Sequence, residues 1–217
     1  MRQFSIAFLY FIAFFASCNL SFGQEESLFN LIEPEKSIDQ LLSENVRYPS
    51  KALQDRKEGS VLLSLKINAA GFIDSLFIIE STDEIFKNEA LLAVGILESK
   101  WSPELLKEKP TDRKFLLFFK FDTFLNEASP NERVKQAEKL IEKENFKKAL
   151  KVLDKLIAEN PYQVNTHELR WQVNLKLGET VEAQKDYLKI KYLEKEFLSV
   201  VEVFAIGSTR SAVPISF

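Results

Sequence analysis

Two kinds of hydrophobic pattern follow one another along the chain and divide it into two modules. Between residues 60 and 121, apolar residues often alternate with polar ones, which is typical of strands that bury one face. From about residue 131 onward, apolar residues recur every three to four positions among Lys and Glu, which is typical of amphipathic helices. We therefore expect an α+β fold, with a small sheet domain over residues 38–124 and an all-α helical module over residues 131–197.

The first module has the pattern of a hairpin, a helix and a third strand, after a short helix around Asp39–Ser43. In SVLLSLKIN the apolar residues alternate, NAAG supplies a turn in which Gly71 can take a positive φ, and FIDSLFIIES is the return strand. Ser81 and Glu84 have capping-box spacing at the start of the next helix. The stretch KFLLFFKFD predicts a third strand, so we expect a three-stranded antiparallel sheet packed on one helix.

The second module repeats a helix–turn–helix plan. The stretch AEKLIEKENFKKALKVLDKLIAENP predicts two helices joined at Glu144-Asn145, and ELRWQVNLKLGETVEAQKDYLKI repeats that plan. Ala149 and Ala183 are 34 residues apart, as are Glu144 and Gly178, and 34 is the period of tetratricopeptide (TPR) repeats. About two repeats fall short of the three or so that stand alone, so we expect them to lean on the first module or on a second copy in a homo-oligomer. Residues 198–217 are β-branched and polar and form a tail with no predicted structure.

The first 23 residues have the layout of a secretory signal peptide. Arg2 is followed by the uncharged apolar run Phe4–Ala16 and by small residues up to Gly23. Cleavage after Gly23 would leave a lead-in segment, residues 24–37, and a periplasmic chain. Two alternatives stay open: FASC resembles a lipoprotein signal with Cys18 as the lipidated residue, or the run is an uncleaved membrane anchor. The run is shorter than the roughly 20 residues of a spanning helix.

Charge and composition exclude several functions. The net charge of −3 gives no basic surface for nucleic acid. The chain has one Cys and one His, so it lacks the several Cys and His residues that a zinc site or an oriented Cys–His catalytic pair requires. His167 stands at the start of a predicted helix, where we expect it to be exposed or to cap the helix. No phosphate loop and no Ser-His-Asp set is evident, so we expect a non-enzymatic protein without metal or cofactor.

Many individually weak marks in the first module occur in an order and spacing that resemble the TonB C-terminal domain family. They run from about residue 45 to 122 and comprise Tyr48-Pro49, Ala52, Glu58-Gly59, Val61, Gly71, Glu89-Ala90 and Trp101-x-Pro103, closing on a Phe-rich strand. Each mark also has a packing role that needs no family. Pro49 fixes the start of the domain, Gly59 permits a sharp bend into the first strand, and Gly71 closes the hairpin. Trp101 is expected to cover one end of the core, with ligand stacking as the sharper alternative.

The resemblance implies binding and not catalysis. In the energy transducers of this family, the domain pairs with a short extended segment of an outer-membrane transporter as an added strand. The candidate edge here is the third strand, and the candidate partner-binding residues along it are Lys114, Leu116, Phe118 and Lys120. The alternate residues of this strand, such as Phe115 and Phe119, are expected to fill the core.

The chain departs from a transducer between the signal and the domain. A transducer needs a membrane anchor and a long proline-rich spacer, whereas Gln24–Tyr48 is short and the seven prolines are scattered. We therefore expect an adaptor of the cell envelope that binds protein or peptide partners, which include segments of outer-membrane transporters. The alternative is a TonB-type energy transducer component for transport across the outer membrane, held by an uncleaved anchor.

Overall fold

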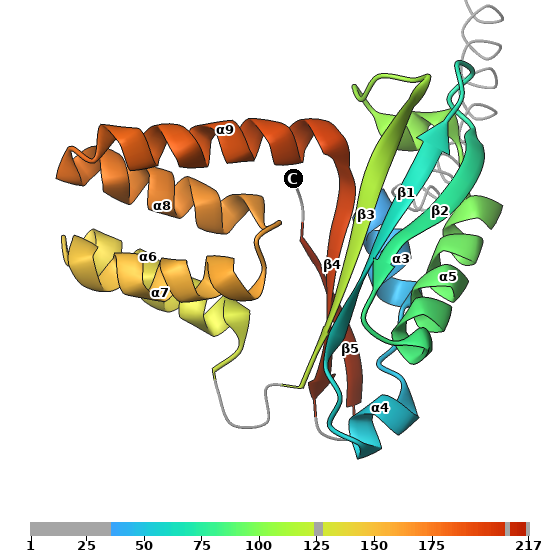
Figure 1. Cartoon of the computed structure of the whole chain (residues 1–217), viewed down its shortest axis with the longest axis horizontal. Coiled ribbons are helices and arrows are strands. Elements are labelled where there is room, and N and C mark those ends of the chain that lie inside the picture. Colours follow the sequence, from blue (N-terminus) through green and yellow to red (C-terminus); the bar gives the residue numbers. More distant parts are fainter. Residues whose placement is uncertain (1–35, 124–127, 207–208, 216–217) are drawn as a thin grey trace, which may run out of the picture. The chain divides into compact units, whose positions relative to one another are not determined.

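The structure, a computed structural model, describes residues 36–123, 128–206 and 209–215. The predicted signal peptide, most of the lead-in segment and Cys18 lie outside these ranges. The chain from Ser37 onward forms one compact unit, whose elements are drawn in Figure 1. In chain order they are α3 (Ile38–Asn45), α4 (Ser50–Gln54), β1 (Gly59–Ile67), β2 (Ile73–Ser81), α5 (Glu84–Ser99), the 3₁₀ helix η1 (Pro103–Leu106), β3 (Arg113–Asp122), α6 (Pro130–Glu142), α7 (Phe146–Glu159), α8 (Val164–Leu177), α9 (Thr180–Glu196), β4 (Phe197–Ile206) and β5 (Thr209–Ile215).

The predicted order of hairpin, helix and third strand is confirmed. β1 pairs antiparallel with β2 on one side and with β3 on the other. Gly71 takes a φ of 84° in the turn between β1 and β2. Helix α5 starts later than predicted, because Asp83 and not Ser81 caps it and accepts a hydrogen bond from the Ile85 amide. Ser81 belongs to β2 instead.

The sheet has five strands in the order β2-β1-β3-β4-β5, two more than the three that the sequence predicts. The additional strands come from the C-terminal segment, for which the sequence predicts only a tail. β4 follows α9 directly, pairs in parallel with β3, and then pairs antiparallel with β5 (Figure 1). The α+β fold class is correct, but one sheet combines both ends of this compact unit.

Both faces of the central strands are covered. On one face, the alternating residues of β1 and β3 pack with α3 and α5, and Val201 and Val203 of β4 join the same core. On the other face, Phe118 of β3 and Phe197 of β4 pack against Ile190 of α9 in a second core. The sheet is therefore shared between the first module and the helical module, which explains why both faces of β3 are apolar.

The helical module consists of two helix–turn–helix units, as the sequence predicts. α6 and α7 are joined through Glu144 at a φ of 55°, and α8 and α9 are joined through Gly178 at a φ of 77°. Ala149 and Ala183, which occupy equivalent places in the two units, are both buried. The 34-residue spacing thus matches a repeated turn and a repeated buried position; membership of the TPR family stays a prediction.

Candidate functional site

The four predicted partner-binding residues all lie on β3 and share one face of it. Lys114 is exposed and lies with its Nζ 5.8 Å from the centroid of the Phe77 ring, while Phe118 is buried. Lys120 forms an ion pair with Asp122 at 3.0 Å, and Leu116 is half-buried beside the second core. Their common face is therefore largely occupied by contacts within the chain.

The prediction that β3 is a free edge is wrong. β1 pairs along one side of it from Gly59↔Phe121 to Ile67↔Arg113, and β4 pairs along the other from Leu116↔Phe197 to Asp122↔Phe204. A strand with a neighbour on both sides has no row of free backbone donors and acceptors to offer to a peptide. The position that the resemblance assigned to a partner strand is occupied by the chain's own C-terminal segment.

Strand β4 is held at this position by both of its faces. Its core-side residues, including Leu198 and Val201, are buried with the first module. The hydroxyl of Ser199 donates to the Asp39 carboxylate of α3 at 2.6 Å. On the opposite face, Phe197 and Val200 pack with the helical module.

A buried carboxylate, Glu202, connects β4 to the α7–α8 connection. Its Oε1 accepts a hydrogen bond of 2.5 Å from Asn160 Nδ2 and another of 2.5 Å from Gln163 Nε2. Only 3% of the residue is exposed. Burial raises the pKa of Glu202, and the two amide donors and the nearby Lys120 offset part of this rise.

A second polar cluster lies at the end of β3. Glu58 accepts hydrogen bonds from the amide of Thr123 at 3.1 Å and from its hydroxyl at 2.5 Å, and these bonds lower the pKa of Glu58. Burial raises the pKa of Asp122, although its ion pair with Lys120 acts in the opposite direction. The carboxylates at this end of the sheet therefore differ in how readily they take up a proton.

A groove of about 940 Å³ opens beside this cluster, between the sheet and the α7–α8 connection. Its apolar part includes Leu62, Phe118 and Tyr162, and the rings of Phe118 and Tyr162 meet edge-on with centroids 4.6 Å apart. Glu80 of β2 and Glu159 of α7 contribute acidic groups to the lining. This groove joins an aromatic surface to negative charge, a combination suited to binding an apolar side chain beside a cationic one.

The residues that carried the family resemblance have packing roles in the structure. Tyr48 is buried, its hydroxyl donates to the Lys57 carbonyl, and its ring contacts Phe86 and Phe121 edge-on. Burial raises the pKa of the Tyr48 phenol. Pro49 precedes α4 as its N-cap residue, and Ala90 is fully buried on α5.

The turn of the β1–β2 hairpin is fixed by three of these residues. Trp101 Nε1 donates to the Gly71 carbonyl at 2.9 Å. A Cβ placed on Gly71 would lie 2.9 Å from Pro103 Cβ, closer than carbon atoms normally approach. Trp101 is half-buried against the core of the first module, in line with the packing role given to it; ligand stacking stays a prediction.

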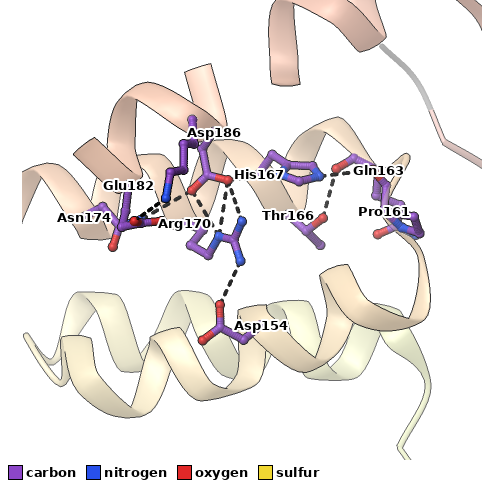
Figure 2. Close-up of polar contacts among 10 residues, drawn as sticks. Asp154, Pro161, Gln163, Thr166, His167, Arg170, Asn174, Glu182 and Asp186 are labelled. Carbon is purple, nitrogen blue, oxygen red and sulfur yellow. Dashed lines mark hydrogen bonds and ion pairs between the residues drawn. The ribbon is translucent and has the colours of Figure 1, made fainter. Parts of the chain in front are cut away.

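The histidine is buried, which corrects the prediction that it is exposed or caps a helix. Nδ1 of His167 lies 3.1 Å from Asp186 Oδ1, and Nε2 lies 3.1 Å from the Pro161 carbonyl (Figure 2). Both ring nitrogens thus face oxygen atoms of the chain, and neither is left for a metal or a nucleophile. The signal in the sequence that could have shown this is the acidic Asp186 on the predicted partner helix.

Asp186 is the centre of this network. Arg170 donates to it at 2.7 Å and also reaches Asp154 of α7 at 2.8 Å, so three helices are connected (Figure 2). Burial of Asp186 disfavours its charge, but hydrogen bonds from His167 and Arg170 outweigh burial and lower its pKa. The arrangement therefore connects the helices of the helical module. In the described part of the chain, no group of three His, Cys, Asp or Glu residues could hold a metal ion.

Comparisons with known proteins agree with the geometry of the first module. Residues 44–123 match the family model described as Gram-negative bacterial TonB protein C-terminal. The NMR solution structure of the Helicobacter pylori TonB C-terminal domain is 25% identical and covers 42% of this chain and 92% of that chain, with a TM-score of 0.32. Because that score is low, the assignment of the module rests on the family match. No curated protein matches the chain. Among the described residues, none of the helices has the length and apolar character needed to cross a membrane.

Proposed function

From the match of residues 44–123 to the TonB C-terminal family, we propose that this chain is a non-enzymatic, exported protein-binding module of the cell envelope. The family match carries the proposal, since this family binds protein partners. The uncharged run Phe4–Ala16 supports export into the periplasm.

We further propose that the helical module acts as the second half of an adaptor. Its repeated turns at Glu144 and Gly178 support a TPR-like scaffold, a class that presents a groove to peptides. Exposed apolar residues of α9, among them Val181 and Leu188, give this module a surface of its own. The two modules share the second core and are therefore packed together.

The alternative, a TonB-type energy transducer component, is less well supported. A transducer of this family receives the partner strand along β3, and in this chain β4 occupies that position from Leu116 to Asp122. We infer that force transmission through a strand added to β3 is not the task of this protein.

The proposal is tested by site-specific photocrosslinking in the native host. A photoreactive residue is placed at exposed Phe77 on the sheet, at exposed Val181 on α9, and at fully buried Leu117 as a matched control. We expect a discrete adduct from at least one of the two exposed positions and none from Leu117, followed by saturable binding of the purified partner to residues 24–217. The absence of any adduct from exposed positions, or recovery of the chain only in the cytosol, would contradict the proposal. An outer-membrane transporter crosslinked along β3 would restore the transducer alternative.

A further inference from the structure

The order of the sheet leaves two strands outermost, β2 and β5. β5 contains Pro214, which has no backbone N–H to donate, and helix α3 lies against β4 and β5. β2 pairs with β1 on one side, and among the described residues no strand pairs with its other side. Because β4 pairs along β3, and β5 carries a proline, β2 is the more open backbone edge of the sheet in the described part of the chain.

The side chains of β2 are unusually apolar for an open edge. Phe77 is 54% exposed, Ile78 43% and Ile79 54%, and these three residues are consecutive. Open edges of soluble proteins are normally protected by charged residues, proline or bulges. Here the register shifts leave Asp74 and Ile79 without direct partners on β1, while Ser75 to Ile78 pair regularly. A short regular segment with exposed apolar side chains thus lies between two irregular ends.

The charges near β2 indicate the chemistry of its partner. Asp74 lies at one end of the strand and is paired with Lys66 at 3.1 Å. Glu80 lies at the other end, in the lining of the groove beside Leu62 and Tyr162, and has no cationic partner among the described residues. Of the other carboxylates that line this groove, Glu159 is paired with Arg133 and Asp122 with Lys120, so Glu80 is the one whose charge faces the open edge. A Lys or Arg side chain is therefore favoured at the Glu80 end.

A second copy of the chain, paired antiparallel with Phe77 at the centre, is disfavoured at this edge. An antiparallel β2–β2 pair centred on Phe77 would place Asp74 of each copy opposite Glu80 of the other. Like charges directly opposite each other destabilise a strand pair, and this arrangement contains two such pairs. The edge instead suits a strand whose own charges are positive.

We propose that β2 binds an extended peptide segment of a partner protein, in which apolar residues alternate with polar ones and a Lys or Arg meets Glu80. Backbone hydrogen bonds to Ser75–Ile78 provide the pairing, and Phe77 contacts an apolar side chain of the peptide. The cationic side chain lies at the Glu80 end of the groove, since Lys189 already lies over the Tyr162 ring. This inference rests on the proposed protein-binding function and names the site through which it acts.

The test uses residues 24–217 and two synthetic peptides, Ac-VKVTVKVT-amide and Ac-VEVTVEVT-amide, followed by NMR of the backbone amides. We expect the Lys peptide to bind saturably, to shift the amides of residues 73–81, and to bind about tenfold more tightly than the Glu peptide. Glu80→Lys should remove or reverse this preference. Phe77→Ser should weaken binding, whereas Leu92→Ser, which removes a 65% exposed apolar side chain on α5, should leave it unchanged.

Several outcomes would overturn the proposal. The proposal is wrong if the peptide shifts only amides of β5 or of the helices. It is also wrong if Glu80→Lys leaves the peptide preference unchanged, or if neither peptide binds saturably. Concentration-dependent dimerisation that Phe77→Ser abolishes would assign the edge to a second copy. If partners crosslink in the host only from Val181, the β2 site fails while the protein-binding function stands; if no exposed position crosslinks, the function itself fails.

Discussion

Replacement of Gly59 by alanine should disturb the aromatic core of the first module. A Cβ at this position would lie 2.6 Å from both Cδ2 and Cε2 of the Phe86 ring and would also collide with Thr82 Oγ1. The Phe86 ring stacks on Phe121 at 4.7 Å and meets Tyr48 edge-on at 6.1 Å, so it cannot move without changing both contacts. The Thr82 oxygen accepts a hydrogen bond from the Ser60 amide at 2.9 Å, which would shift as well.

The expected loss follows from these contacts. Overpacking of a core costs about 1–3 kcal/mol, and a disturbed aromatic pair costs about 0.5–1.5 kcal/mol. We therefore expect Gly59→Ala to lower the free energy of unfolding by about 2–4 kcal/mol. For a chain of this size, that loss lowers the Tm by roughly 4–16 °C.

A matched control uses the same substitution elsewhere in the module. Gly95 lies inside α5 on an exposed face, and a Cβ added there would have no atom within 4 Å, so Gly95→Ala should raise stability by about 0.5–1 kcal/mol. Urea unfolding of residues 24–217, followed by circular dichroism, measures both variants. Phe86→Leu should relieve part of the strain, so the double variant with Gly59→Ala should lose less than the sum of the single losses. Equal stability changes in Gly59→Ala and Gly95→Ala would mean that the space at Gly59 is not closed by Phe86 and Thr82.

Three further predictions concern the polar contacts. Burial raises the pKa of Glu202 above its ordinary 4.5, so this group stabilises the fold below that pH, and the contribution is lost as the pH rises through the raised pKa. The stability of Glu202→Gln relative to wild type should therefore increase between pH 4 and pH 8. Urea titrations measure this difference, and a difference that does not change with pH would contradict the prediction. Trp101→Phe replaces the indole by a smaller aromatic ring that cannot donate to the Gly71 carbonyl, and should cost at least about 1 kcal/mol in the same assay. Arg170→Met leaves Asp186 buried without its main cation and should cost about 3 kcal/mol, while Lys185→Met at an exposed ion pair should cost less than about 0.5 kcal/mol.

Local patterns in the sequence were sufficient for most elements of the fold. The alternation around Val61 and Leu63 predicted β1, and Gly71 marked the turn to β2 because only a residue that tolerates positive φ fits there. The repeated spacing of Glu144 and Gly178 located both turns of the helical module. These features depend on residues close together in the chain.

The strand that completes the sheet depends on contacts far apart in the chain and was missed. FLSVVEVFAI is apolar on both faces, which is typical of a strand buried on both sides, but its partner β3 precedes it by about 80 residues. Asn160 and Gln163 are likewise far from Glu202 in the sequence, so their hydrogen bonds to it could not be predicted. These bonds offset part of the cost of burying the Glu202 carboxylate. The candidate edge was therefore placed on β3 because nothing local to β3 shows that it is already paired.

The measurement that tests this account most directly is hydrogen exchange of the backbone amides of β3 in the free chain, residues 24–217, resolved by NMR. If β4 pairs with β3 as the structure has it, the amides of Leu117–Phe121 on both sides of the strand should exchange slowly and at similar rates, close to the global unfolding limit. On β2, by contrast, slow and fast amides should alternate, because one side of that strand is open. Alternating fast and slow amides along β3, with uniform protection along β2, would show that the free edge is β3 and would contradict the account.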